Sequence, residues 1–251
     1  MSKLLIILII VVLYIIIYIK LDTFMLIPIK INKYNSNNIF NIDNKHYAIY
    51  VKRNTDRILL LCGASKGNLD IYNNLISKYH YLYDYDILCI EYPGYGVIKR
   101  ECNIDNCIEE IYFWIQYIKN LGYKTIDMGG YSIGGGIMIE CLKKYNITYI
   151  NNIYLVATFT SLSEVVYQKN YLLYLIHEIF LKKHNLDIYS NLKDIECNKL
   201  YIIHSIEDEL VPFSMAQKNF SSKCNNIKNK SFIIGKGKHD KIILESNFKL
   251  Y

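Results

Sequence analysis

The stretch "DMGGYSIGGGIM", residues 127–138, places five glycines around a single serine, Ser132. Residues 130–134 read G-x-S-x-G, after an apolar run typical of a strand and before a segment that predicts a helix. In such a turn the strand and the helix approach too closely for side chains at Gly130 and Gly134, and the serine adopts a strained backbone conformation. Ser132 would then project at the helix N-terminus, where the helix dipole favours a developing negative charge. The pentapeptide alone is not specific, because chance matches are common.

Around this stretch the chain alternates short β-rich runs with segments of helical periodicity. Most of the runs are continuously apolar, as expected for strands of a parallel sheet that is covered on both faces. Residues 107–122 carry apolar side chains at helical spacing, and Gly122 is placed to end that helix. The alternation predicts an α/β fold, a mostly parallel central sheet with helices on both faces and right-handed crossovers. The expected strands are residues 46–51, 57–63, 86–92, 126–131, 153–158, 200–205 and 231–236.

The glycines mark one edge of the predicted sheet. The chain has 12 glycines, and all except Gly122 lie at or just beyond the C-terminal ends of the predicted parallel strands. Open α/β sheets bind their ligands at this edge, in the crevice outside the carboxyl ends of the strands. We therefore expect the functional site there.

Two further residues of chemical interest fall at the same edge. In "YIIHSIEDELVPF", Asp208 lies a few residues past the end of a strand, and in "IIGKGKHDKIIL", His239 follows the last strand and opens the final predicted helix. A serine, an aspartate and a histidine on three strand-end loops predict nucleophilic catalysis, in which His239 removes the proton of Ser132 and Asp208 fixes the imidazole. The backbone N–H groups of Ile133 and Ala64 are the predicted oxyanion donors.

Other residues compete for the same roles. His204 ends a strand near the predicted site and is the main rival to His239, although it precedes Asp208 in the chain. Glu207 and Glu209 flank Asp208 and are either surface charges or a substitute acid. The remaining histidines are expected to be structural, and Asp240 is a candidate helix cap. These histidines are His46, His80, His177 and His184.

The N-terminal segment predicts a membrane anchor over residues 1–22. Sixteen apolar residues stand without interruption between Lys3 and Lys20. At about 1.5 Å of helical rise per residue they span roughly 24 Å, and the flanking lysines can snorkel to the bilayer surface. No Ala, Gly or Ser occurs from Lys3 to Asn35, which disfavours a cleaved signal peptide. Counting positive charges on either side favours a single-pass protein with a cytoplasmic catalytic domain.

Composition excludes several other classes. The net charge of +6 comes from lysines scattered along the chain, with no arginine-rich run, so we expect no nucleic-acid partner. The seven cysteines include no CxxC pair and are odd in number, so we expect neither a zinc site nor a full disulfide framework. We also expect no other metal and no cofactor. Cys102 and Cys107 are either free thiols in a reducing compartment or a disulfide in an oxidising one.

Taken together, five motifs give the chain a family resemblance. The segments "EYPGYG", "GYSIGGG", "ATFTSLSEV", "HSIEDELVPFS" and "GKGKHD" stand in the order and approximate spacing of the membrane-anchored "alpha/beta hydrolase domain-containing" branch of the α/β-hydrolase superfamily. The resemblance covers roughly residues 45 to 250, and the order Ser132, Asp208, His239 is the one this fold uses. One departure is Cys62-Gly63, where relatives usually carry His-Gly at the strand that supplies an oxyanion donor.

The resemblance implies an activity. It implies an α/β-hydrolase domain over residues 23–251 that cleaves acyl esters or thioesters through an acyl-enzyme, and some relatives remove palmitoyl groups from membrane proteins. The family places a cap over the pocket at about residues 161–190; here that segment is apolar and either holds an acyl chain or merely packs on the sheet. The implied substrates are acyl esters, lipids or lipidated proteins. The alternatives are an aminopeptidase-like hydrolase, which needs an acidic pocket at a residue such as Glu164 or Glu178, and a non-catalytic binding protein.

Overall fold

The computed structural model describes residues 25–36, 38–76, 84–169 and 185–242, together with the single residues 5 and 12. The predicted membrane anchor over residues 1–22 therefore lies outside the described residues, apart from those two. Among the helices that the structure describes, none has both the length and the apolarity that a membrane span requires.

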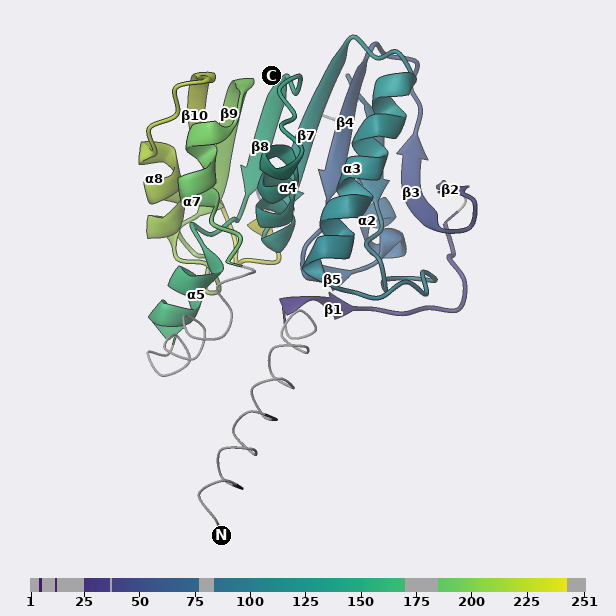
Figure 1. Ribbon diagram of the computed structural model, residues 1–251, viewed down its shortest axis with the longest axis horizontal. Helices are drawn as coiled ribbons and strands as arrows, with labels where there is room; N and C mark the ends of the chain where they lie inside the picture. Colours follow the sequence, from purple (N-terminus) through teal and green to yellow (C-terminus); the bar gives the residue numbers. More distant parts are fainter. Residues whose placement is uncertain are drawn as a thin grey trace.

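The predicted sheet is confirmed as the centre of the molecule (Figure 1). Each of the seven expected runs forms a strand, and a further strand, β2, adds to the edge next to β3. Six strands are parallel to one another, whereas β3 and β2 are antiparallel to their neighbours. In spatial order the strands are β10 (Ile227–Gly235), β9 (Cys197–Ser205), β8 (Asn152–Val156), β7 (Thr125–Tyr131), β4 (Arg57–Cys62), β6 (Asp86–Ile90), β3 (His46–Val51) and β2 (Ile39–Ile42).

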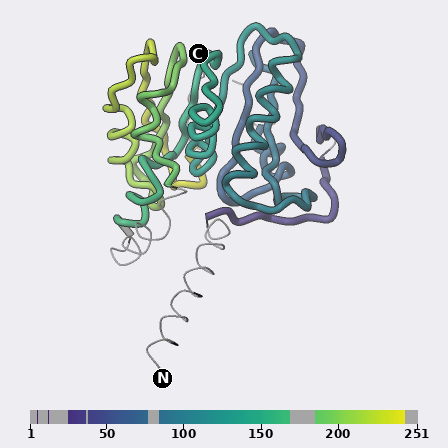
Figure 2. Tube along the Cα trace, in the orientation of Figure 1, coloured from purple at the N-terminus to yellow at the C-terminus, as the bar shows by residue number. Residues whose placement is uncertain are grey.

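Helices cover both faces of this sheet, as predicted. The path of the chain in Figure 2 places most described helices on one face, whereas α2 (Leu69–Ile76) packs against β3 and β6 from the other. Two apolar cores result, one on each side of the sheet. The helices of the first face are α3 (Ile104–Asn120), α4 (Ile133–Lys144), α7 (Ile188–Asn191) and α8 (Phe213–Ser221), with a short 3₁₀ turn, η3 (Leu192–Asp194), after α7.

The end of α3 confirms the prediction made for Gly122. The helix begins after Asn103, whose side chain accepts a hydrogen bond from the Asn106 N–H at 2.7 Å. It ends at Asn120, and Gly122 follows with a φ of +79°, a left-handed conformation that favours glycine. α3 and α4 contact each other on one face of the sheet, and β7, which joins them in the chain, leads to the Ser132 turn.

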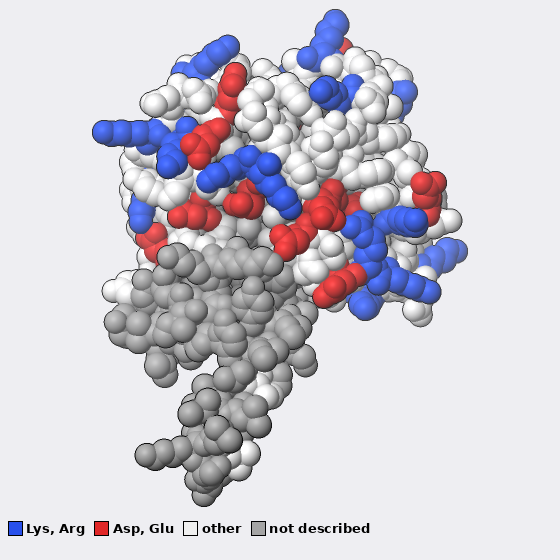
Figure 3. Space-filling view, in the orientation of Figure 1, with Lys and Arg blue, Asp and Glu red and all other residues white. Residues whose placement is uncertain are grey.

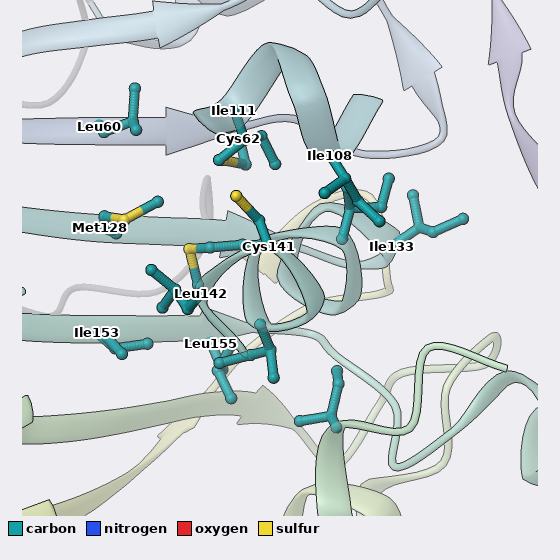
Figure 4. Packing of buried hydrophobic residues seen from close by; sticks show 14 of the residues in the cluster. Leu60, Cys62, Ile108, Ile111, Met128, Ile133, Cys141, Leu142, Ile153 and Leu155 are labelled. Atoms are coloured by element: carbon teal, nitrogen blue, oxygen red, sulfur yellow. The ribbon is translucent and has the colours of Figure 1, made fainter. Parts of the chain in front are cut away.

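The packing of α4 onto the sheet fixes the turn that precedes it. Figure 4 shows Cys141 and Leu142 of α4 above side chains of three neighbouring strands, Leu60 of β4, Met128 of β7 and Ile153 of β8. All five side chains are at most 1% exposed. Because α4 is seated on three strands at once, its first residue has little freedom to move relative to the end of β7.

A second, two-stranded sheet fixes the loop that follows β4. β1 (Ile27–Pro28) pairs in parallel with β5 (Lys66–Gly67), and the Ile27 N–H donates to the Ser65 carbonyl at 2.8 Å. In Figure 1 this small sheet lies at the same edge of the molecule as α5 (Leu162–Lys169), beyond the C-terminal ends of the parallel strands. No disulfide joins Cys102 to Cys107 in this structure.

Candidate active site

Ser132 lies on the sharp turn between β7 and α4. Its φ of 54° and ψ of −123° fall in a region that non-glycine residues rarely occupy, as the sequence predicted. A Cβ at Gly130 would collide with the backbone of Gly135, and a Cβ at Gly134 with the carbonyl oxygens of Cys62 and Gly63. The strand, the helix and the loop after β4 therefore meet at a distance that only glycines allow. The serine hydroxyl projects from this crowded point.

The structure brings Ser132, His239 and Asp208 together in one hydrogen-bonded chain. His239 Nε2 lies 3.0 Å from Ser132 Oγ, and His239 Nδ1 lies 2.8 Å from Asp208 Oδ2. A carboxylate can only accept, so Nδ1 carries the proton and Nε2 presents its lone pair to the serine hydroxyl. This is the tautomer in which a histidine can remove a proton from Ser132.

Asp208 is held as an anion. Burial by itself would raise the pKa of Asp208, but hydrogen bonds from His204, His239 and the Val211 N–H outweigh it and lower the pKa below its ordinary value. The backbone N–H groups of Leu210 and Val211 donate to Oδ1 at 2.9 and 2.8 Å, which leaves Oδ2 for the histidines. The carboxylate therefore has one oxygen fixed by its own loop and one directed at the imidazole.

His204, the rival to His239, contacts the acid rather than the serine. Its Nε2 lies 2.9 Å from the Val211 carbonyl oxygen and 3.2 Å from Asp208 Oδ2. Both atoms are acceptors, so Nε2 carries the proton and is shared between them. His204 is fully buried, and its Nδ1 has no partner among the described residues. The sequence placed His204 near the site but gave no indication that it would bond to Asp208.

His239 is held in place by Tyr131, which the sequence did not single out, and by Glu209, which was predicted to be a surface charge or a substitute acid. The Tyr131 ring stacks on the imidazole, with centroids 5.7 Å apart, and the Tyr131 hydroxyl donates to the His239 carbonyl. The His239 N–H donates to Glu209 Oε2 at 3.1 Å. Glu209 thus positions the backbone of the histidine, while Glu207 is exposed and takes no part in the Asp208–His239 pair. The one available signal for Tyr131 was its place directly before Ser132.

The two predicted oxyanion donors differ in the structure. Ile133 is the first residue of α4, so its N–H belongs to the helix end, where backbone donors lack intrahelical partners. The Ala64 N–H instead donates to the Tyr72 hydroxyl at 2.8 Å. Cys62, which departs from the usual His-Gly, is 2% exposed and packs in the core beside Cys141 and Ile111 (Figure 4).

The two ends of the predicted cap lie against each other. The Leu162 N–H donates to the Asn185 carbonyl at 2.8 Å, and the Ser163 hydroxyl donates to the Asn185 side chain at 2.7 Å. Residues 170–184, which include Glu178, lie outside the described residues. Glu164, the other acidic candidate for an amine pocket, accepts hydrogen bonds from Lys218 Nζ at 2.8 Å and from the Thr160 hydroxyl at 2.7 Å.

The described residues form no metal cluster, and the face shown in Figure 3 carries charges of both signs. Within the described residues, no group of three or more His, Cys, Asp or Glu side chains is arranged to hold a metal ion. On the face shown in Figure 3, the Lys and Arg side chains are interspersed with Asp and Glu.

Comparison with known proteins agrees with this fold. An esterase of Pyrococcus furiosus superposes with a TM-score of 0.65 at 14% identity, covering 88% of this chain and 91% of the esterase. A lipase-esterase related protein of Clostridium acetobutylicum gives a TM-score of 0.59 at 19% identity, covering 80% and 94% of the two chains. Mouse alpha/beta hydrolase domain-containing protein 10 gives 0.54 at 14% identity, covering 80% and 90%. The chain therefore has the α/β-hydrolase fold.

Comparison of sequences alone is less informative. A protein of Acanthamoeba polyphaga mimivirus, described as uncharacterized, is 26% identical over 225 residues, which cover 79% of this chain and 72% of that protein. No family model matches the sequence. The assignment of the fold consequently depends on the three-dimensional arrangement of the strands and helices.

Proposed function

We propose that this protein is a serine hydrolase that cleaves acyl esters or thioesters by way of an acyl-enzyme. The observation that carries the proposal is the continuous chain of hydrogen bonds from Asp208 through His239 to Ser132, with the serine on a strained turn at a helix N-terminus. The esterase and lipase-esterase folds among the similar structures support ester hydrolysis in general. Cleavage of thioesters and the use of the serine as nucleophile are parts of the proposal.

In the proposed reaction, Ser132 Oγ attacks the acyl carbon while His239 Nε2 takes its proton. The carbonyl oxygen becomes an oxyanion beside the Ile133 N–H, and Asp208 stabilises the imidazolium that has formed. Collapse of this intermediate breaks the ester or thioester bond, and His239 returns the proton to the departing alcohol or thiol. Water then attacks the acyl-enzyme by the same steps, which releases the acid and restores the serine.

Exposed apolar side chains near the site favour an acyl substrate. Ile206 and Leu210, on either side of Asp208 in its loop, are 67% and 45% exposed. Ile27, in the small sheet at the same edge, is 50% exposed. Each would lose contact with water if an acyl chain or a lipid surface covered this edge. The anchor over residues 1–22 and the cap over residues 161–190 belong to the same proposal, since both would bring lipid or lipidated protein to the site.

Among the described residues, nothing gives comparable support to the aminopeptidase-like alternative. A peptidase of that kind needs an unpaired carboxylate to receive the free amine of its substrate. Glu164 already has the ammonium group of Lys218 at 2.8 Å, so its charge is neutralised within the protein. The non-catalytic alternative would require the Ser132–His239–Asp208 connection to serve no purpose.

A panel of substrates tests the proposal. Purified protein is incubated with p-nitrophenyl esters of increasing acyl length, with an acyl thioester and with aminoacyl p-nitroanilides. We expect the esters and the thioester to turn over with an initial burst, and the acyl-enzyme to be trapped on Ser132 by mass spectrometry. Faster turnover of the aminoacyl amides than of every ester would overturn the acyl-ester assignment. Absence of any acylated serine during turnover would overturn the covalent mechanism.

A further inference from the structure

The Ala64 N–H, one of the two predicted oxyanion donors, already has a partner inside the protein. It donates to the hydroxyl oxygen of Tyr72, in the first turn of α2, at 2.8 Å. A substrate oxygen approaching along this N–H bond would meet the tyrosine oxygen first. The Ala64 amide can therefore reach an oxyanion only through Tyr72, or after Tyr72 has been displaced.

The Tyr72 side chain lies against two glycines of the loop that follows β4. A Cβ at Gly63 would lie 2.5 Å from the Tyr72 hydroxyl oxygen, and a Cβ at Gly67 would lie 2.9 Å from it. Two glycines of the loop after β4 thus leave the volume that the phenol fills. The same loop is fixed by β1, through the pairing of residues 27–28 with residues 66–67. The absence of side chains at Gly63 and Gly67 therefore leaves the space that the Tyr72 phenol occupies.

The Tyr72 hydroxyl has a proton to give. Its oxygen accepts from Ala64, so the O–H bond points elsewhere, and none of the residues that the structure describes accepts this proton. Burial raises the pKa of the Tyr72 hydroxyl, so the group stays protonated. A donor that itself accepts a hydrogen bond is polarised and donates more strongly. The N–H of Ala64 therefore strengthens the O–H of Tyr72 as a donor.

The loop that carries Ala64 is in contact with the turn that carries Ser132. A Cβ at Gly134 would collide with the carbonyl oxygen of Gly63, the residue directly before Ala64. Tyr72 and Tyr131, the residue directly before Ser132, belong to the same apolar cluster on the α2 face of the sheet. The hydroxyl of Tyr72, bonded to the Ala64 N–H, is thus held by a loop that touches the Ser132 turn.

We propose that the Tyr72 hydroxyl is the second oxyanion donor, acting together with the Ile133 N–H. The Ala64 N–H donates a hydrogen bond to the tyrosine oxygen and thereby polarises its O–H bond. This inference rests on the proposed serine-hydrolase function. It names a side chain that touches the reacting oxygen, where the sequence predicted a backbone group. The competing role for Tyr72 is that of a plug, which blocks Ala64 until it moves away.

The variant Tyr72→Phe separates the two roles. It keeps the ring between Gly63 and Gly67 and removes only the hydroxyl. Loss of a single oxyanion donor typically lowers kcat by about 10² to 10³. We expect a fall in kcat of that size with little change in KM, and an equal loss of affinity for an acyl trifluoromethyl ketone, whose adduct carries the oxyanion. An unchanged or increased kcat would overturn the inference and identify Tyr72 as idle or as a plug.

Tyr92→Phe is the matched control. The Tyr92 hydroxyl also bonds to this loop, donating to the Gly63 carbonyl at 3.2 Å, but on the opposite side of the peptide group that Gly63 shares with Ala64. Tyr92→Phe should keep kcat within about threefold of the wild type. If Tyr72→Phe and Tyr92→Phe lowered kcat equally, the hydroxyls would merely support the loop, and the inference would be wrong.

A second variant covers the case in which Tyr72→Phe fails to fold. Gly63→Ala keeps every donor but places a Cβ where the Tyr72 oxygen lies, so it should also lower kcat, with thermal unfolding measured alongside. A folded Gly63→Ala protein with wild-type kcat would contradict the inference.

Labelling of the wild type by a fluorophosphonate is measured before the variants are compared. Failure to label Ser132 would refute the serine-hydrolase proposal itself. If Ser132 is labelled but Tyr72→Phe loses no activity, only the role of Tyr72 is refuted.

Discussion

Two histidine–carboxylate pairs in this molecule have nearly the same geometry and different surroundings. His239 Nδ1 lies 2.8 Å from Asp208, and His46 Nδ1 lies 2.9 Å from both oxygens of Glu110. Both carboxylates have no exposed side-chain surface. The first pair lies at the C-terminal edge of the sheet, whereas the second joins β3 to α3.

The carboxylates of the two pairs are held differently. Glu110 also accepts hydrogen bonds from Arg100 at 2.6 Å and from Trp114 Nε1 at 2.8 Å, and yet burial dominates and raises its pKa. Asp208 shows the opposite direction, since its hydrogen bonds outweigh burial and lower its pKa. An acid that must stabilise an imidazolium during a reaction has to be ionised, which favours the Asp208 arrangement.

The two imidazole rings also differ in the contacts that they make away from their carboxylates. His46 stacks on Phe113, with ring centroids 3.6 Å apart, so its ring is part of the apolar packing over α3. His239 instead directs Nε2 at a serine that is held at a strained φ of 54°. A histidine–carboxylate pair is therefore only a structural element until a nucleophile stands at its free nitrogen.

The largest expected effect follows from removing the nucleophile. Ser132→Ala deletes the atom that would form the acyl-enzyme, and comparable changes in serine hydrolases lower kcat by roughly 10⁶. We expect turnover of p-nitrophenyl esters to fall to the background rate, with the unfolding temperature little changed, because alanine keeps the Cβ and with it the strain of the φ of 54°. Retention of more than about a hundredth of the wild-type kcat would contradict the role given to Ser132.

The next effect comes from the acid of the first pair. In Asp208→Asn the side-chain oxygen would stay with the N–H groups of Leu210 and Val211, because an oxygen alone can accept them. The amide NH₂ would then face His239 Nδ1 and force the proton onto Nε2, which can no longer accept from Ser132. We expect kcat to fall by about 10⁴, with KM little changed, in steady-state kinetics.

Glu110→Gln is the matched change in the second pair. It removes the charge that His46 and Arg100 share, and breaking a buried pair of this kind costs about 3 kcal/mol of unfolding free energy. Denaturant unfolding should show that loss, while kcat of the folded protein stays within about twofold of the wild type. A fall in kcat comparable to that of Asp208→Asn would show that the His46–Glu110 pair also affects the reaction and does not only stabilise the fold.

A third buried carboxylate predicts a smaller, pH-dependent effect. Burial raises the pKa of Glu91 from 4.5 to about 8, although Leu69 N–H and the Tyr34 hydroxyl donate to it. The folded state therefore keeps a proton that the unfolded state loses. Its contribution to stability is fully present below about pH 4.5 and is lost as the pH rises through about 8.

Urea unfolding at about pH 5 and about pH 9 measures this contribution. The wild type should lose more stability between the two pH values than Glu91→Gln, whose amide does not titrate. Equal losses would show that Glu91 is ionised in the folded protein at both pH values. Glu110→Gln removes only the titration of Glu110, so the part of the pH dependence that comes from Glu91 should stay unchanged.

The sequence was most predictive where local patterns decide the structure. The runs at residues 46–51 and 57–63 are apolar enough to form strands in any α/β sheet, and the glycines beside Ser132 leave the turn few alternatives. The order of Asp208 and His239 along the chain then placed both at the same sheet edge. Each of these inferences needs only a few neighbouring residues.

What escaped prediction depends on contacts between distant residues. β2 (Ile39–Ile42) is a strand because β3 offers it an edge, since its own residues "IFNI" are too few and too mixed to predict one. The bond between His46 and Glu110 joins residues 64 positions apart, and that between Tyr131 and His239 joins residues 108 apart. Tyr72 is only eight residues from Ala64, but whether its hydroxyl reaches the amide depends on how α2 is set against the loop.

The most direct test of the central claim is to label the protein with a fluorophosphonate probe and to locate the adduct by mass spectrometry. We expect that the wild type and Glu110→Gln are labelled on Ser132 and that Ser132→Ala is not labelled. Asp208→Asn should react far more slowly than Glu110→Gln, which compares the two histidine–carboxylate pairs in one assay. Equal labelling of the wild type and Ser132→Ala, or no labelling of either, would contradict the claim that Ser132 is an activated nucleophile.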